Sequence, residues 1–159
     1  MLKLIKCEFL KLKRKKFIPL IILAAFLFPI PLTYLMTTPS MMERYTDQAD
    51  AFDGLFNMVL GYGIQFLLPC IIGVIAAILF FMERDNDTFK NLRTIPVTST
   101  QMVLAKIIVL FLFGIVFCVA STIATILCGF GTLEVYGIGY KLFLAVETGI
   151  FITAGTLPL

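Results

Sequence analysis

The chain has 159 residues, of which 60% are hydrophobic and 14% charged, whereas roughly a quarter of the residues of a soluble domain carry charge. This composition excludes an ordinary soluble domain and predicts an all-α protein, a single transmembrane domain over residues 1–159 that crosses the membrane several times. The net charge is +3, and the absence of histidine and of a P-loop motif excludes histidine-based catalysis, histidine metal sites and a nucleotide site formed by this chain alone.

The first segment, residues 1–16, is basic and carries regularly spaced apolar residues. Leu2, Ile5, Phe9 and Leu12 recur at helical intervals, and lysines fill the other faces. One interpretation is an amphipathic interfacial helix that lies on the inner leaflet of the membrane. The other is a solvated basic leader that only orients the protein.

Four long apolar runs follow, at about residues 17–36, 55–82, 107–131 and 142–159. The hydrocarbon core of a bilayer is about 30 Å thick and needs roughly 20 apolar helical residues to cross it. Glu147 in the fourth run is the only carboxylate or ammonium that interrupts them. Each run therefore predicts a transmembrane helix.

Prolines are expected to interrupt two of these helices. Pro29 and Pro31 fall deep in the first run and should kink or end its helix, because proline lacks the N–H that an α-helix requires. The second run is longer than a bilayer needs, so we expect its first part at or above the outer surface. A break near Pro69 is expected there.

Charge indicates the orientation of the chain. Basic residues cluster before the first run and in the polar segment 83–106, whereas segment 37–54 has only Arg44 against four acidic residues. These acidic residues are Glu43, Asp47, Asp50 and Asp53. Since lysine and arginine near span ends mark the cytoplasmic side, we predict a cytoplasmic N-terminus, a cytoplasmic segment 83–106 and an external segment 37–54. The first run is too long for a signal peptide and is read as a retained anchor.

Segment 83–106 is predicted to contain a short helix exposed to the cytoplasm. Asp87 or Thr88 can cap this helix, and Pro96 ends it. Phe89 and Leu92 form its apolar face, whereas Lys90 and Arg93 form a charged face. The exposed apolar face favours docking to a partner protein. A capping box at residues 98–101 is expected to start the next helix, with Lys106 extending its ammonium toward the membrane surface.

Glu147 is the one ionisable side chain well inside a predicted span. Such residues face the protein interior or a watery path, because exposure to lipid is costly, so Glu147 is a candidate intramembrane polar site. The alternative is that the fourth span starts later, or that Glu147 lies near the outer headgroups. No metal site is predicted, since the run Asp85-Asn86-Asp87 lacks the glycine and glutamate of a calcium loop.

Three parts of the sequence resemble those of one family. They are segment 4–14 (LIKCEFLKLKR), segment 83–93 (ERDNDTFKNLR), and the Pro96-Val97-Thr98 step with Lys106. Together they resemble the permease subunit of an ABC-2 type exporter, particularly of the lantibiotic-immunity and bacitracin-resistance kind. The first segment resembles the interfacial connecting helix of such permeases, and the second resembles the coupling helix that docks on the ATPase subunit.

The resemblance implies that one set of residues couples the chain to the ATPase. They are Glu83, Asp87, Thr88, Phe89, Lys90, Leu92, Arg93 and Pro96. It also implies an ABC ATPase subunit, a second permease copy or homologue and membrane lipids as partners, in a multi-pass protein of a bacterial cell membrane. It implies no catalytic residue, no cofactor, no metal and no nucleic-acid partner.

The fourth apolar run reaches Leu159 with no polar residue to close it, and the permeases that the chain resembles have about six spans. We therefore expect the sequence to be a fragment or a truncated product of a longer six-helix permease.

Two functions fit these features. The first is a transport subunit that exports an antimicrobial peptide or another amphipathic compound, driven by a separate ATPase. The alternative is a stand-alone immunity protein that sequesters a cationic peptide toxin at the acidic segment 37–54.

Overall fold

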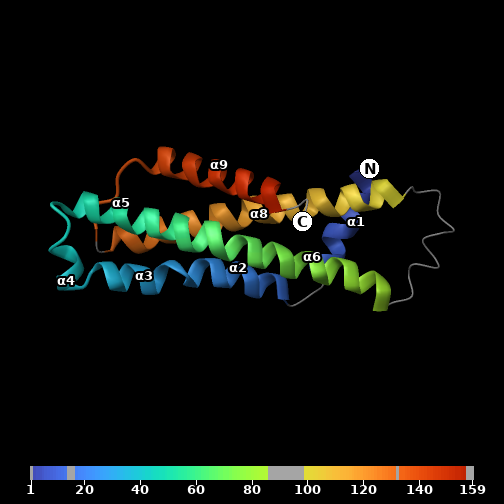
Figure 1. Ribbon diagram of the computed structural model, residues 1–159, viewed down its shortest axis with the longest axis horizontal. Helices are drawn as coiled ribbons and strands as arrows, with labels where there is room; N and C mark the ends of the chain where they lie inside the picture. Colours follow the sequence, from blue (N-terminus) through green and yellow to red (C-terminus); the bar gives the residue numbers. More distant parts are fainter. Residues whose placement is uncertain (1, 14–16, 86–98, 132, 157–159) are drawn as a thin grey trace.

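The computed structural model describes residues 2–13, 17–85, 99–131 and 133–156. Every regular element among these residues is a helix, which confirms the all-α class. Four helical runs are long and apolar enough to cross a membrane: Pro19–Met36, Gln48–Phe81, Thr100–Phe130 and Ile138–Thr156. They extend along the long axis of the molecule (Figure 1), as expected of a polytopic membrane protein.

The first span consists of two helices, α2 (Phe17–Leu27) and α3 (Pro29–Met36), which meet at Phe28. Pro29 has no N–H to donate to the preceding turn, but it is tolerated in the first turn of α3, where that N–H is not needed. The hydroxyl of Thr33 donates a 2.8 Å hydrogen bond back to the carbonyl of Pro29. The predicted interruption of this span by proline is confirmed.

The second span changes helix type along its length. It runs through α5 (Gln48–Met58), the π-helix η1 (Val59–Leu67) and α6 (Leu68–Asp85). Pro69 is the second residue of α6, after the π-helix ends, and cannot donate to the carbonyl four residues before it. A wider π turn is one way in which a helix accommodates such a gap in its bonding. The break expected near Pro69 is therefore a change of helix type, and the helical run continues through it.

Three helical runs begin before the apolar runs that they contain. The second begins at Gln48, ahead of the apolar run from residue 55. The third, α8 (Ser99–Phe130), begins before residue 107, and the fourth, α9 (Ile138–Thr156), begins before residue 142. These early turns contain charged residues, so hydrophobicity alone does not mark them. Contacts with other helices hold them instead, because each contains buried side chains such as Phe52, Lys106 and Lys141.

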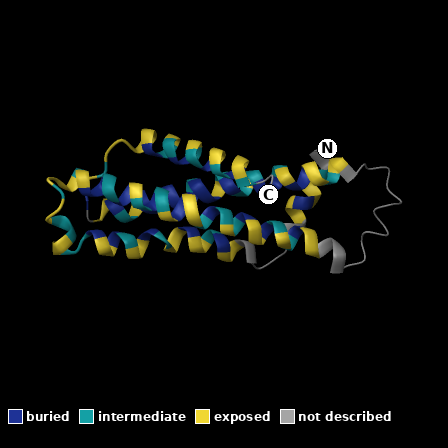
Figure 2. Ribbon diagram, in the orientation of Figure 1, coloured by how far each residue is buried: buried dark blue, intermediate teal, exposed yellow. Residues whose placement is uncertain are grey.

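Helix α8 lies at the centre of the bundle and packs against helices of all three other spans. Figure 2 shows that buried positions face the spaces between helices and exposed positions face outward. The approach of α9 is especially close, because a Cβ at Gly114 would overlap Thr153, and a Cβ at Gly149 would overlap Cys118. The small residues on both helices therefore decide how near α9 can come.

Two short helices mark the ends of the bundle. α1 (Leu2–Lys13) runs across the long axis and packs against α8, where α6 ends and α8 begins (Figure 1). α4 (Pro39–Met42) lies at the opposite end, with the start of α5 and the connection between α8 and α9. We refer to these as the α1 end and the α4 end.

Candidate functional site

Of the predicted coupling residues, the structure describes only Glu83. Glu83 lies in the last turn of α6, which ends at Asp85. The others, Asp87, Thr88, Phe89, Lys90, Leu92, Arg93 and Pro96, lie outside the described residues. The flanking helices α6 and α8 pack against each other, and α8 also packs against α1. The segment therefore connects two helices that share one packed unit with α1.

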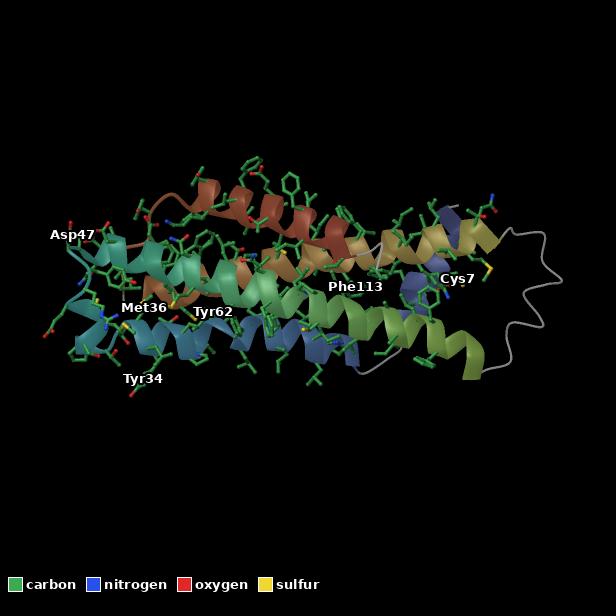
Figure 3. All side chains as sticks on the ribbon, in the orientation of Figure 1. Cys7, Tyr34, Met36, Asp47, Tyr62 and Phe113 are labelled. Atoms are coloured by element: carbon green, nitrogen blue, oxygen red, sulfur yellow. The ribbon has the colours of Figure 1, made fainter. Side chains whose placement is uncertain are left out.

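Two charged residues are buried near this end. Glu8 on α1 is 4% exposed and Lys106 on α8 is 2% exposed. Next to Glu8, the ring of Phe9 stacks on that of Phe113 in α8, with centroids 5.8 Å apart. Helix α1 is thus attached to the bundle by side-chain packing, and Figure 3 shows Phe113 well inside the bundle, near the middle of α8. Amphipathic spacing in the sequence did not reveal that α1 buries an acidic residue.

Lys106 contacts a neighbouring helix, with its Nζ atom 4.4 Å from the centroid of the Phe80 ring on α6. The expected extension of its ammonium toward the membrane surface stays a prediction. A cation over an aromatic face contributes about 0.5–2 kcal/mol, depending on how far it is desolvated. Lys106 and Phe80 also line an open groove of about 610 Å³ between α6 and α8.

At the α4 end, Lys141 is the centre of a cluster that joins α9 to α5. It is 5% exposed, and its Nζ forms an ion pair with Oδ1 of Asp53. The hydroxyl of Tyr136 donates a hydrogen bond to Oδ2 of the same carboxylate. The ammonium also lies 4.3 Å from the Tyr136 centroid, 4.9 Å from that of Phe52 and 5.6 Å from that of Phe56. The ion pair and the three rings together offset the burial of this charge.

Tyr136 precedes α9 and stays a hydrogen-bond donor at neutral pH. Its hydrogen bond to Asp53 raises the phenol pKa above the usual value of 10.0, and the negative charge of that carboxylate acts in the same direction. Sequence reasoning missed this cluster. Two features of the sequence could have indicated it. Segment 37–54 has more acidic than basic residues, and a single lysine, Lys141, lies at the edge of the fourth apolar run.

The other acidic residues of segment 37–54 remain on the surface. Glu43, Asp47 and Asp50 are exposed. The hydroxyl of Thr46 donates a 2.5 Å hydrogen bond to Asp50. Among the residues that the structure describes, Asp53 is the acidic residue of this segment that pairs with a lysine.

Glu147 lies midway along α9 and is exposed. The opposite face of the helix is the buried one, formed by Lys141, Ala145, Gly149 and Thr153. The structure therefore directs Glu147 away from the interior of its own bundle. Large apolar side chains surround it on the outer face, including Tyr140, Phe143 and Phe151.

Within the described parts of the chain, no three side chains of the metal-binding types Cys, Asp and Glu lie close enough to hold a metal ion. The residues that the structure brings together serve packing and charge pairing, and they form no recognisable set of catalytic groups. The described residues form a membrane bundle, and the predicted coupling segment joins two of its helices, α6 and α8, along the chain.

Comparison with known proteins agrees with this arrangement. The family model described as ABC-2 family transporter protein matches residues 4–159, which include α1 and all four spans. No curated protein and no solved structure matches the sequence. The chain belongs to the ABC-2 transporter family and is the membrane permease of an ABC exporter, which works with an ABC ATPase subunit.

Proposed function

We propose that the chain exports an antimicrobial peptide or another amphipathic compound, and that its ATPase docks on segment 83–106. In this proposal the α1 end is cytoplasmic and the α4 end is external, in agreement with the distribution of lysine and arginine. The main supporting observation is the position of α8, which begins directly after the predicted docking helix and packs against helices of all three other spans.

This position suggests how ATP hydrolysis would move the bundle. Closure of the ATPase pair pushes on the helix predicted for residues 87–95 and through it on the ends of α6 and α8. Because α8 is the central helix, a tilt of α8 changes its contacts with every other span. Coupling of this kind requires that the ATPase binds the two conformations of the permease with different free energies.

A second permease copy or homologue completes the transport unit in this proposal. The exposed carboxylate of Glu147 supports it, because a carboxylate that faces lipid near the middle of a span costs about 2.5–3.5 kcal/mol. Contact with a hydrogen-bond donor on a neighbouring helix removes part of that cost. The surface around Glu147 is therefore the part of α9 that we assign to this contact.

The cargo is proposed from the surface of the α4 end. The exposed carboxylates of Glu43, Asp47 and Asp50 are suited to attract a cationic peptide from the outside. The same carboxylates support the alternative function, a stand-alone immunity protein that sequesters a peptide toxin. That alternative needs no ATPase, which is the difference that an experiment can measure.

The test is affinity purification of the full-length protein from its native membrane in mild detergent, followed by quantitative mass spectrometry. The export proposal expects an ATPase with a P-loop to co-purify in a fixed ratio to the permease. A variant with Phe89→Ala and Leu92→Ala, which removes the proposed docking face, should lose the ATPase. If the permease binds a cationic peptide but no ATPase in several detergents, sequestration replaces export.

A further inference from the structure

The groove between α6 and α8 lies near the α1 end and has a volume of about 610 Å³. This volume falls within the range of roughly 300–1,000 Å³ that is usual for sites of small organic ligands. Its wall on α6 includes Gly73, Ala76 and Phe80, its wall on α8 includes Lys106 and Leu110, and Thr156 of α9 lines it as well.

Small side chains create the space. Gly73 has no side chain, and a Cβ built there would meet no atom within 4 Å. Ala76, one turn further along α6, contributes only a methyl group to the same wall. The groove is therefore open toward the surroundings of the bundle, where the acyl chains of the bilayer lie.

The groove has a lysine at one end: Lys106, which is 2% exposed, lines it with Nζ above the ring of Phe80. Its other walls are almost entirely aliphatic, formed by residues such as Ile72, Ala76 and Leu110. A ligand that matches this pattern has an anionic group at one end and a hydrocarbon chain behind it.

The position of Lys106 along the membrane normal fits the anionic end of a lipid. The span Thr100–Phe130 has 31 residues. At 1.5 Å per residue it is about 46 Å long against a hydrocarbon core of about 30 Å, so roughly 8 Å projects at each end if it is centred. Lys106 is about 9 Å along the helix from Thr100 and so lies close to the boundary between headgroups and hydrocarbon.

We propose that this groove binds an anionic glycerophospholipid of the cytoplasmic leaflet. The phosphate lies at the end lined by Lys106 and Phe80, and one acyl chain runs past Ala76 and Gly73 toward Thr156. Basic pockets between transmembrane helices on the cytoplasmic side recognise anionic headgroups in this way. The bound lipid fills the space between the two helices that flank the predicted docking segment and so supports their packing.

The experiment uses the full chain purified in detergent and incubated with equal amounts of palmitoyl-oleoyl phosphatidylglycerol and palmitoyl-oleoyl phosphatidylcholine. The two lipids have the same acyl chains and differ in net charge, and native mass spectrometry counts the molecules of each that stay bound. One lysine near an anionic headgroup contributes about 1 kcal/mol, so we expect roughly a fivefold preference for phosphatidylglycerol.

Two variants separate the role of charge from that of the groove. Lys106→Gln should bind both lipids equally, whereas Lys6→Gln, which removes an exposed lysine of α1 outside the groove, should keep the preference. Gly73→Leu should lose both lipids, because the new side chain fills the groove. Its control is Gly61→Leu in the same span, where a Cβ also meets no atom within 4 Å but which does not line the groove.

Four results would overturn the proposal. One is equal retention of the two lipids by the unaltered protein, and another is a preference that persists in Lys106→Gln. The third is a Gly73→Leu protein that keeps as much lipid as Gly61→Leu. The fourth is a lipid-free dimer that Gly73→Leu dissociates, because a second copy would then fill the groove. The measurement contains no ATPase, so its outcome is independent of the test of export.

Discussion

Lys141 illustrates how single residues of this chain place charge inside an apolar bundle. Its ammonium is almost completely buried, and the partner carboxylate of Asp53 comes from α5, far away in sequence. Removing one partner of a buried pair leaves an uncompensated charge, which costs more than the intact pair contributes. The pair is only half enclosed, because the Asp53 side chain is 42% exposed and water screens it.

We therefore predict that Asp53→Ala lowers the free energy of unfolding by about 1–3 kcal/mol, because Lys141 loses its counter-ion. Thermal unfolding in detergent measures the loss. The matched control is Asp47→Ala, at an exposed acidic residue that forms no side-chain cap with α5. Adding Lys141→Met to Asp53→Ala should recover part of the loss, and a double variant as unstable as the sum of the two single ones would contradict this account.

At the scale of helices, close approach between α8 and α9 depends on two glycines. Gly149 faces the thiol of Cys118, and Gly114 faces the methyl group of Thr153, with no room for a further carbon at either position. Gly149 and Thr153 share the buried face of α9 with Lys141, so packing along this face also positions the ion pair of Lys141 with Asp53.

Gly149→Leu is expected to destabilise the protein by about 1–3 kcal/mol, because overpacking forces α9 away from α8. The readout is the unfolding midpoint in detergent. Gly155→Leu places the same side chain on the same helix, where a Cβ meets nothing within 4 Å, and should leave the midpoint unchanged. Equal midpoints for the two variants would show that α9 is not held by this contact.

The predicted docking helix between α6 and α8 is also tested at this scale. Phe89→Ala combined with Leu92→Ala should reduce transport roughly tenfold or more while insertion stays normal, since loss of two apolar anchors weakens docking by about 1.4 kcal/mol or more. Resistance of cells to the exported compound, normalised to protein in the membrane, gives the measurement.

The matched control for this pair removes one phenylalanine and one leucine elsewhere, with Phe26→Ala and Leu23→Ala on the exposed face of α2. Unchanged resistance in the Phe89 and Leu92 variant would remove the coupling role from segment 83–106. Equal loss in both variants would point to a general defect in packing or insertion.

At the scale of the whole molecule, the proposed association of two permease copies depends on the outer surface of α9. Glu147 is exposed near the middle of this span, with the buried face of the helix on the opposite side. A carboxyl group in that position is stabilised by a hydrogen bond across an interface between helices, worth about 1–2 kcal/mol.

Glu147→Leu should therefore weaken the association of two permease copies by roughly tenfold, as measured by light scattering of the purified protein in detergent. Glu147→Gln keeps the capacity to form hydrogen bonds and should preserve the assembly. The idea fails if the leucine variant dimerises as strongly as the unaltered protein.

The sequence by itself determined the all-α class, the number of apolar helices long enough to span a membrane and the interruption of the first span by proline. Each follows from local properties: the length of an apolar run, or the missing N–H of a proline. The apolar runs do not mark where the helices start, because charged residues such as Lys106 and Lys141 lie within the helices. The residues predicted to dock the ATPase stay a prediction.

Only the tertiary structure decided which charges are paired and which faces are exposed. Lys141 and Asp53 are 88 residues apart in sequence, and their contact depends on how α9 rotates against α5. The same holds for Lys106, which lies over Phe80 of α6, and for Glu147, whose outward position follows from the buried glycine and alanine on the other side of α9. Helical periodicity defines the faces of a helix, but packing between distant helices decides which of those faces is buried.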